Sequence, residues 1–184
     1  MPRRRAAATS GDRVRAHGVP LLRPLDQPGP DDASGAELIG TGAAHLFAEI
    51  DQPDTNFVLR LWDAAPDGRR QLLTTGYLKT SHRERAEERT TEGNPYHPHT
   101  RAVPVVHGTI EEYVLRLYPF AATLRPGHRL VAELSNDEPL TDAHNALLPP
   151  DSFHLPVDRP VTHKIYRDAQ HPSRLVLPFT VGRE

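Results

Sequence analysis

Apolar and polar residues alternate along the chain from Glu37 onward with a period of two. This period is typical of strands that bury one face against a core. The side chains expected on the buried face of the first strand are those of Ala44, Leu46, Ala48 and Ile50, with His45, Phe47 and Glu49 on the other face. The pattern predicts a half-buried β-strand that ends at the break formed by Gln52-Pro53-Asp54.

A hairpin is predicted next. Phe57, Leu59 and Leu61 alternate with Val58, Arg60 and Trp62, and residues 71–79 fit the returning strand. The segment Ala65-Pro66-Asp67-Gly68 between them has the composition of a tight turn, because proline presets φ and glycine accepts a positive φ.

Further strands are predicted at residues 110–118, where Tyr113, Leu115 and Leu117 share a face, and at 130–134, 162–166 and 175–181. Two polar, proline-rich connections, residues 82–108 and 135–160, separate them, and the charged stretch 83–89 is long enough for one or two helical turns. Many short strands without a long helix predict an all-β fold, an antiparallel β-sandwich or jelly roll. A parallel sheet would need crossover helices, for which the chain has no room.

The first 35 residues differ from the rest of the chain. Arginines at positions 3–5 precede an alanine run and then Gly, Pro and Asp residues without hydrophobic period, which predicts a disordered or poorly ordered leader over residues 1–35. A secretory signal would need an apolar stretch after the arginines, whereas an Arg-rich organelle transit peptide stays open as an alternative. Residues 36–184 are expected to form one domain of ordinary size.

Charge and composition exclude several classes of protein. The formal net charge of −2 argues against nucleic-acid binding, and no apolar run is long enough to cross a bilayer. The chain has no cysteine, which excludes disulfides, thiolate metal sites and cysteine nucleophiles and agrees with a cytoplasmic location. We expect no cofactor.

Two patterns raise the question of a metal site. His97-Pro98-His99 has the spacing of paired imidazole ligands, but Val103 and Pro104 stand where a cupin site would add a glutamate. Histidines that hydrogen-bond a neighbouring domain fit this loop better than metal ligands do. Asp51, Asp54 and Asn56 lack the glycine and the ligand spacing of a calcium-binding loop, and turn formation is their expected role. We predict no metal-binding residue.

Catalytic signals are also missing. None of the six serines lies in a Gly-x-Ser-x-Gly motif, the turn that exposes an α/β-hydrolase nucleophile. Trp62, the single tryptophan, is expected to anchor a core or an interface rather than to stack on a sugar. We predict no catalytic residue in this chain.

Four segments nevertheless occur together in the order and spacing of a known family. They are residues 51–57 with Pro66-Asp67-Gly68, then Ser81-His82-Arg83 with residues 95–100, then residues 124–130, and finally residues 166–178. On these motifs, residues 37–181 resemble the C-terminal non-catalytic domain of the X-Pro dipeptidyl-peptidase and cocaine esterase (CocE/NonD) group of serine hydrolases. The resemblance implies a galactose-binding-like jelly roll that packs against an α/β-hydrolase domain, which holds the catalytic triad.

The same resemblance implies a chain that is not an enzyme on its own, a truncated or split form whose partner is the catalytic domain. The polar composition of the long loop suits a partly polar interface. The residues expected on the docking surface are Ser81, His82, Arg83, Tyr96, His97, His99 and Arg101. The alternative is a free-standing, lectin-like module that binds a carbohydrate on the jelly-roll face.

Overall fold

The computed structural model describes residues 12–15, 36–136 and 161–180, and these residues form an all-β structure. The strands are β1 (Asp12–Arg15), β2 (Ala36–Ile50), β3 (Asn56–Ala64), β4 (Arg70–Lys79), β5 (Glu111–Leu124), β6 (Arg129–Ser135), β7 (Thr162–Tyr166) and β8 (Arg174–Val176). Two 3-10 helices, η1 (Thr80–His82) and η2 (Glu87–Arg89), follow β4. Neither of these described helices has the length and apolarity needed to span a membrane. The predicted all-β class is confirmed.

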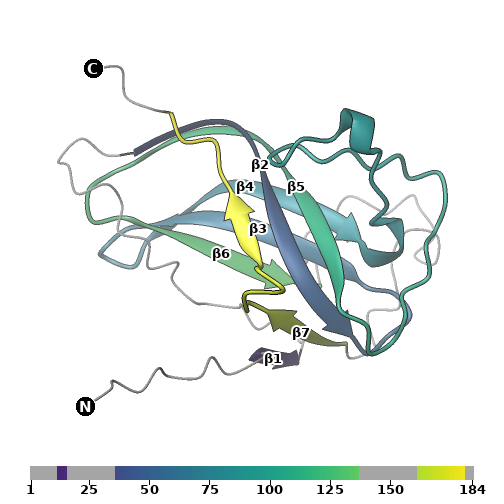
Figure 1. Cartoon of the computed structure of the whole chain (residues 1–184). Helices are drawn as coiled ribbons and strands as arrows, with labels where there is room; N and C mark the ends of the chain where they lie inside the picture. The colour runs from purple at the N-terminus through teal and green to yellow at the C-terminus, as the bar shows by residue number, and fades with distance from the viewer. Residues whose placement is uncertain (1–11, 16–35, 137–160, 181–184) are drawn as a thin grey trace, which may run out of the picture.

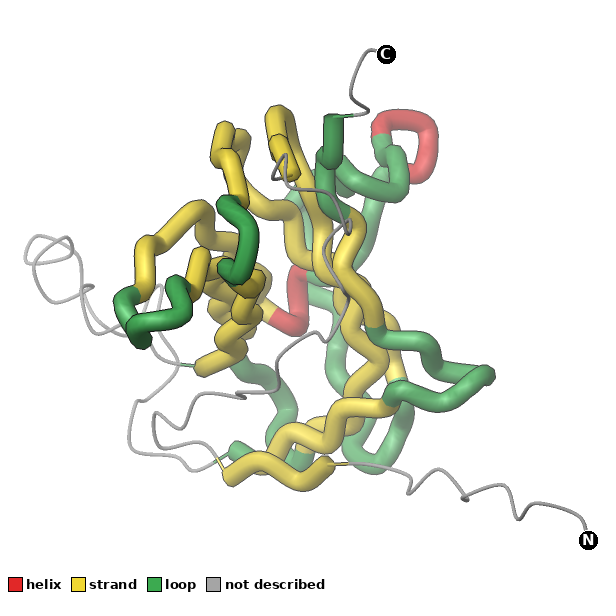
Figure 2. Tube along the Cα trace, turned by 90° about the vertical axis from the view of Figure 1, so that its left-hand side faces the viewer, coloured by secondary structure: helices red, strands yellow, loops and turns green. Residues whose placement is uncertain are grey.

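The strands form one antiparallel sheet in the order β1-β7-β2-β5-β4-β3-β6, and β8 also pairs with β2. Among the described residues, β4 and β5 are joined at a single pair, Gly76 and Leu117. The sheet therefore has two wings, and β2 and β5 run obliquely across β3, β4 and β6 (Figure 1). Figure 2 shows the same strands from the side, curled around the core as a half-barrel.

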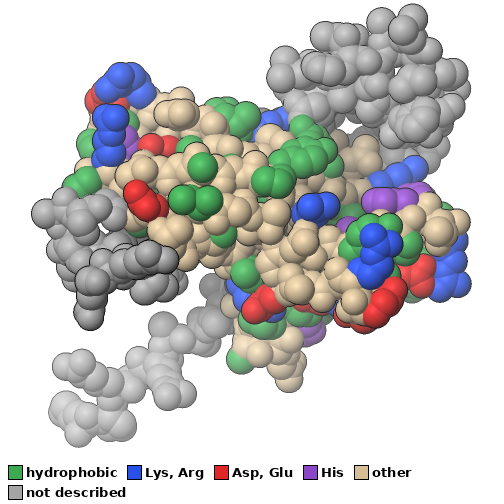
Figure 3. All heavy atoms as spheres, turned by 90° about the horizontal axis from the view of Figure 1, so that it is seen from above, with side chains coloured by type: hydrophobic (Ala, Val, Ile, Leu, Met, Phe, Trp, Pro, Cys, Tyr) green, Lys and Arg blue, Asp and Glu red, His purple; other side chains and the backbone are tan. Residues whose placement is uncertain are grey.

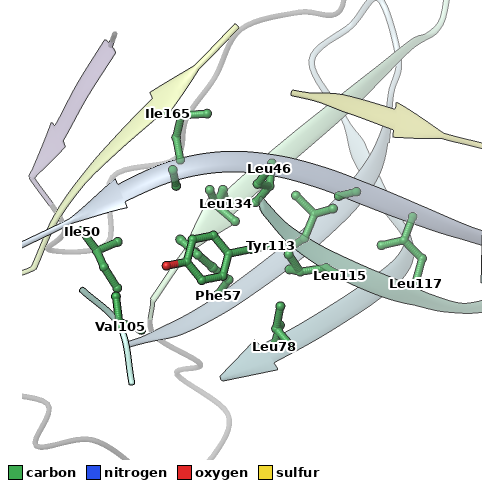
Figure 4. Close-up of a cluster of buried hydrophobic side chains, with 13 residues drawn as sticks. Leu46, Ile50, Phe57, Leu78, Val105, Tyr113, Leu115, Leu117, Leu134 and Ile165 are labelled. Carbon is green, nitrogen blue, oxygen red and sulfur yellow. The ribbon is translucent and has the colours of Figure 1, made fainter. Parts of the chain in front are cut away.

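The core lies between these two wings. Side chains from β2 and β5 meet side chains from β3 and β4, as Figure 4 shows for Leu46, Phe57, Leu78, Tyr113 and Leu115. Fully burying one such side chain contributes about 1.5–3 kcal/mol relative to leaving it exposed. The faces predicted from the alternation are confirmed, since the side chains of Ala44, Leu46, Ala48, Ile50, Phe57, Leu59, Leu61, Tyr113, Leu115 and Leu117 are all buried.

The predicted hairpin is also confirmed. Strands β3 and β4 pair from Asn56 with Lys79 to Ala64 with Arg70. At the turn, the N–H of Gly68 donates to the carbonyl of Ala65 at 3.0 Å, and Gly68 has a φ of 88°. A side chain at this φ would be strained, so glycine is the residue that closes the turn.

The last strand is shorter than predicted. Instead of covering residues 175–181, β8 spans Arg174–Val176. Pro178 follows, which has no N–H to continue the ladder, and its carbonyl accepts a hydrogen bond from Ile39 at 3.0 Å. Phe179 then forms an isolated bridge with Leu38.

The chain ends and one long connection are described only in part. Asp12–Arg15, inside the predicted leader, form β1 and pair with β7 at the edge of the sheet. The remainder of the leader and the connection 137–160 lie outside the described residues. Strand β2 begins at Ala36, next to the predicted start of the domain.

Candidate docking loop

Residues 80–110, which we call the histidine loop, connect β4 to β5 and contain the residues predicted to dock a partner. The loop stands at one end of the molecule in Figure 1. Histidine, arginine and acidic side chains gather on the surface at that end (Figure 3). The contacts of each side chain decide whether it faces a partner or holds the loop in place.

Asp54 anchors the start of the loop. One carboxylate oxygen accepts hydrogen bonds from the Thr80 hydroxyl at 2.6 Å and the Ser81 N–H at 2.9 Å, and the other accepts from the Ser81 hydroxyl at 2.7 Å. Burial alone would raise the pKa of Asp54, but these hydrogen bonds outweigh it and the pKa lies below the usual value of 3.8. Ser81 is buried and bonded to Asp54, so it holds the loop rather than facing a partner.

Arg83 ties the two ends of the loop together. Its guanidinium donates to the carbonyls of Val103 at 2.9 Å and Pro104 at 3.2 Å and to the Glu111 carboxylate at 3.3 Å. Nearby, the N–H of Val103 donates to the carbonyl of Ser81 at 2.7 Å. The Arg83 side chain is 11% exposed, so its guanidinium is occupied inside the domain.

His97 spans the space between the loop and the sheet. One ring nitrogen lies 3.0 Å from the carbonyl oxygen of Glu84, and the other lies 2.8 Å from that of Val114 in β5. Since β4 pairs with β5 at Leu117 alone among the described residues, β5 has no β4 partner at Val114. His97 therefore gives the Val114 carbonyl a hydrogen-bonding partner at a position where β4 does not pair with β5.

His45 makes the matching contact from β2. Its Nδ1 lies 3.0 Å from the Glu112 carboxylate in β5, and its Nε2 lies 3.0 Å from the carbonyl oxygen of Glu92 in the loop. Period two placed His45 on the face away from the core, but its side chain is buried and contacts the histidine loop. The contact was missed because alternation along one strand gives no sign of a segment that folds over it.

Several stretches of the loop are exposed, and we call two of them, residues 99–102 and 106–107, the exposed rim. Arg101 pairs with the Glu84 carboxylate, and this bond holds the pKa of Glu84 below its usual range. Val106 is 58% exposed. His99 has a φ of 52°, a left-handed conformation that is costly for a side-chain-bearing residue.

The other predicted docking residues lie behind this rim. His82 and His97 flank His99, with ring centroids 5.5 and 5.9 Å from its own. Burial, followed by the charges of His97 and His82, lowers the pKa of His99. Tyr96 is half-buried beneath the Arg89 guanidinium, which lies 3.4 Å from the ring centroid. The loop therefore brings the seven predicted residues into one segment, with His99 and Arg101 exposed.

Two other candidate sites from the sequence are a metal site and a tryptophan that could stack on a sugar. Within residues 12–15, 36–136 and 161–180 there is no group of three or more His, Asp or Glu side chains that could hold a metal ion. Trp62 is half-buried, and its indole N–H has neither solvent contact nor a hydrogen-bond partner.

Comparison with known proteins agrees with the fold and with the motifs. The chain is 28% identical over 145 residues to the cocaine esterase of Rhodococcus sp. (strain MB1 Bresler), covering 78% of this chain and 23% of the esterase. A CocE/NonD family hydrolase from Staphylococcus aureus shares the fold with a TM-score of 0.67 at 18% identity, over 81% of this chain and 29% of that one.

An aminopeptidase from a Thaumarchaeota archaeon of marine sediment shares the fold as well, with a TM-score of 0.58 at 22% identity, over 86% of this chain and 25% of its own. The chain thus spans about a quarter of the length of each of these relatives. Residues 33–176 match the model of the X-Pro dipeptidyl-peptidase C-terminal non-catalytic domain. The match covers most of the chain, which therefore belongs to the family of X-Pro dipeptidyl-peptidase C-terminal non-catalytic domains.

Proposed function

We propose that this chain is an accessory jelly-roll β-sandwich, of the galactose-binding type, that docks on an α/β-hydrolase catalytic domain of the CocE/NonD group. The catalytic domain belongs to an X-Pro dipeptidyl-peptidase or an acyl esterase and supplies the Ser-His-Asp chemistry. The domain itself acts in a truncated or split form, in the cytoplasm, and binds no cofactor. The family match and the quarter-length coverage of hydrolase relatives support this proposal.

The observation that carries the docking proposal is the way the histidine loop is held. The loop is fixed by hydrogen bonds of four side chains, those of Asp54, Arg83, His45 and His97. A surface that is ordered before association loses less conformational entropy when it binds. The exposed rim, with apolar Val106 beside polar His99 and Arg101, has the mixed composition of an accessory interface. Ser81 and Arg83 position this rim.

A charge introduced at Val106 tests the proposal. The partner is a CocE/NonD catalytic domain from the same genome, prepared without its own C-terminal domain, and the affinity is measured by titration calorimetry. Val106→Asp is expected to weaken association about tenfold or more, because it places a charge on the apolar residue of the proposed contact. Its thermal midpoint should stay close to that of the unmodified chain, since the side chain is 58% exposed.

Tyr118→Asp is the matched control. Tyr118 is 59% exposed and lies in β5, away from the loop. If Tyr118→Asp weakens association and Val106→Asp does not, the outer face of β4 and β5 is the interface and the loop proposal is wrong. If the unmodified chain does not bind at all, the docking function itself fails.

The carbohydrate-binding alternative has less support. Tyr77 and Tyr118 are exposed on neighbouring strands, but their rings are tilted by 57° with centroids 6.1 Å apart. Two rings at this angle do not form the flat platform on which a sugar ring stacks.

A further inference from the structure

The contacts of His45 and His97 share an unusual feature. In each ring, both nitrogens face an oxygen that can only accept a hydrogen bond. For His97 the two acceptors are the backbone carbonyls of Glu84 and Val114. For His45 they are the Glu112 carboxylate and the Glu92 carbonyl. A neutral imidazole carries hydrogen on one nitrogen only, so it can complete one of its two bonds.

The charge state of Glu112 decides whether the carboxyl group can donate a hydrogen bond to His45. Burial would raise the pKa of Glu112, but the His45 hydrogen bond and the nearby charges of Arg85 and His45 outweigh burial and lower it. An ionised carboxylate has no proton to donate. The Nδ1 of His45 must therefore carry hydrogen, and the Nε2 must carry another to reach the Glu92 carbonyl.

We propose that His45 and His97 form a proton-dependent clasp that holds the histidine loop on β2 and β5, complete when both rings are doubly protonated and loosened when they are neutral. His45 reaches from the sheet to the loop, and His97 reaches from the loop to the sheet. Loss of one proton from either ring removes a bond. It also sets a nitrogen lone pair about 3 Å from an oxygen lone pair.

Charged groups from β5, β8 and the loop lie near His45. The Glu112 carboxylate is in direct contact at 3.0 Å. Arg85 opposes it through its own bond to Glu112 at 3.3 Å. Arg174, the cross-strand partner of His45 in β8, is paired with the Glu92 carboxylate at 3.0 Å. Arg85 is also paired with Glu87 at 3.2 Å, so Glu112 is the charged group in direct contact with the His45 ring.

The groups around His97 lie mainly in the loop itself. The Glu84 side chain is paired with Arg101, so its charge is balanced. His99 is 5.9 Å away between ring centroids, and His82 lies beyond it. From β5, the group facing His97 is the uncharged Val114 carbonyl. Burial, and after it the charges of His97 and His82, lower the pKa of His99.

Histidine changes its charge between about pH 5 and pH 8. The clasp is therefore expected to be complete near pH 5 and loosened near pH 8. It is a property of this domain alone and does not require docking. If the exposed rim docks as proposed, association should weaken as the pH rises over the same range.

The first test reads the rings directly. In the isotope-labelled chain, nitrogen chemical shifts distinguish a doubly protonated imidazole from either neutral tautomer. The expected result at pH 5 is hydrogen on both nitrogens of His45 and of His97. A bare nitrogen on either ring at pH 5 would overturn the proposal. This measurement needs no variant, so it stands even where a substitution impairs folding.

The second test follows the loop. Backbone amide exchange over residues 84–96 is measured by mass spectrometry for His97→Gln and for His107→Gln, a matched change at an exposed loop histidine. Because both variants are compared at one pH, intrinsic exchange rates cancel. The rate ratio between them should be about fivefold at pH 5, the effect of one hydrogen bond of average strength, and should fall toward one by pH 8. A ratio that does not change with pH would contradict the clasp.

Discussion

At the residue scale, the buried polar groups of this domain fall into two kinds. Asp54 and Thr80 are fully bonded to each other and to the loop backbone. The hydroxyl of Tyr113 and the Nε2 of His163 are also buried among the described residues, but no hydrogen-bond partner accompanies them. An unbonded buried polar group opposes folding, and its effect grows if it must take a charge.

His163 is the clearest such case, and its substitution should change how stability depends on pH. Burial lowers its pKa to about 4, with Asp51 acting weakly in the opposite direction. The unfolded side chain has a pKa near 6.5, so the folded state binds its proton less readily. The free energy of unfolding is therefore not reduced by His163 above about pH 6.5. As the pH falls toward 4, protonation of His163 in the unfolded state reduces it by up to about 3 kcal/mol.

His163→Leu should remove most of this loss, because leucine has no proton to bind. The measurement is the free energy of unfolding from denaturant titrations at several pH values between 4 and 7. His107→Leu is the control, since His107 is exposed and the same substitution there should leave the pH dependence of the unmodified chain. An equally steep acid loss in His163→Leu would mean that other groups cause it.

The residues chosen as a docking surface show what sequence reasoning reaches at this scale. The motifs contain six of the seven, Arg101 follows them directly, and the structure shows that segment as one loop. They did not separate Ser81 and Arg83, which hold the loop, from His99 and Arg101, which face outward. A motif marks the residues that a fold needs as well as those that a partner needs. Separating the two requires burial and contacts, which adjacent positions in a sequence do not give.

At the element scale, the strands could be predicted because each buries one face, and period two records that directly. The order of the strands in the sheet could not be predicted from the sequence. Strand β5 lies between β2 and β4 although 60 residues separate Ile50 from Glu111, and neighbours that distant leave no local signal. The loss of ladder pairing between β4 and β5 on either side of Gly76 and Leu117 was equally invisible.

Gly76→Ala should test that junction. A Cβ at this position would lie 2.6 Å from the carbonyl oxygen of Arg116 and 3.0 Å from a methyl of Leu117. Backbone cannot yield as a side chain can, so β4 and β5 must separate. We expect a loss of about 3 kcal/mol in the free energy of unfolding, measured by denaturant titration.

Gly93→Ala supplies the comparison for that variant. Its added Cβ would lie 3.5 Å from a methyl of Val176, which is ordinary van der Waals contact. A change within about 0.5 kcal/mol is expected there, as for most substitutions outside special positions. Equal stability of the two alanine variants would show that the close approach at Gly76 does not constrain the sheet.

At the scale of the whole molecule, family membership has to be separated from activity. The chain belongs to a non-catalytic domain family and spans about a quarter of its hydrolase relatives. The activity that those relatives carry in their names comes from proteins about three times as long. A hydrolase assignment would therefore be a statement about the larger enzyme, and the properties of this domain rest on its sheet and its histidine loop.

The last prediction is that the purified chain hydrolyses neither an activated ester nor an X-Pro anilide above the buffer rate. Acyl transfer needs a serine activated by a histidine base. The three serines in the described part of the chain have other partners: Ser81 donates to Asp54, the Ser173 hydroxyl accepts from the N–H of Phe47 at 2.8 Å, and that of Ser135 accepts from Arg60 at 3.2 Å. An intact CocE-type esterase serves as the positive control in the same assay. Turnover that a serine-directed inhibitor and a single Ser→Ala substitution both abolish would contradict the prediction and place a catalytic site within this domain. Without such turnover, any hydrolysis gained when a catalytic domain is added can be assigned to that partner.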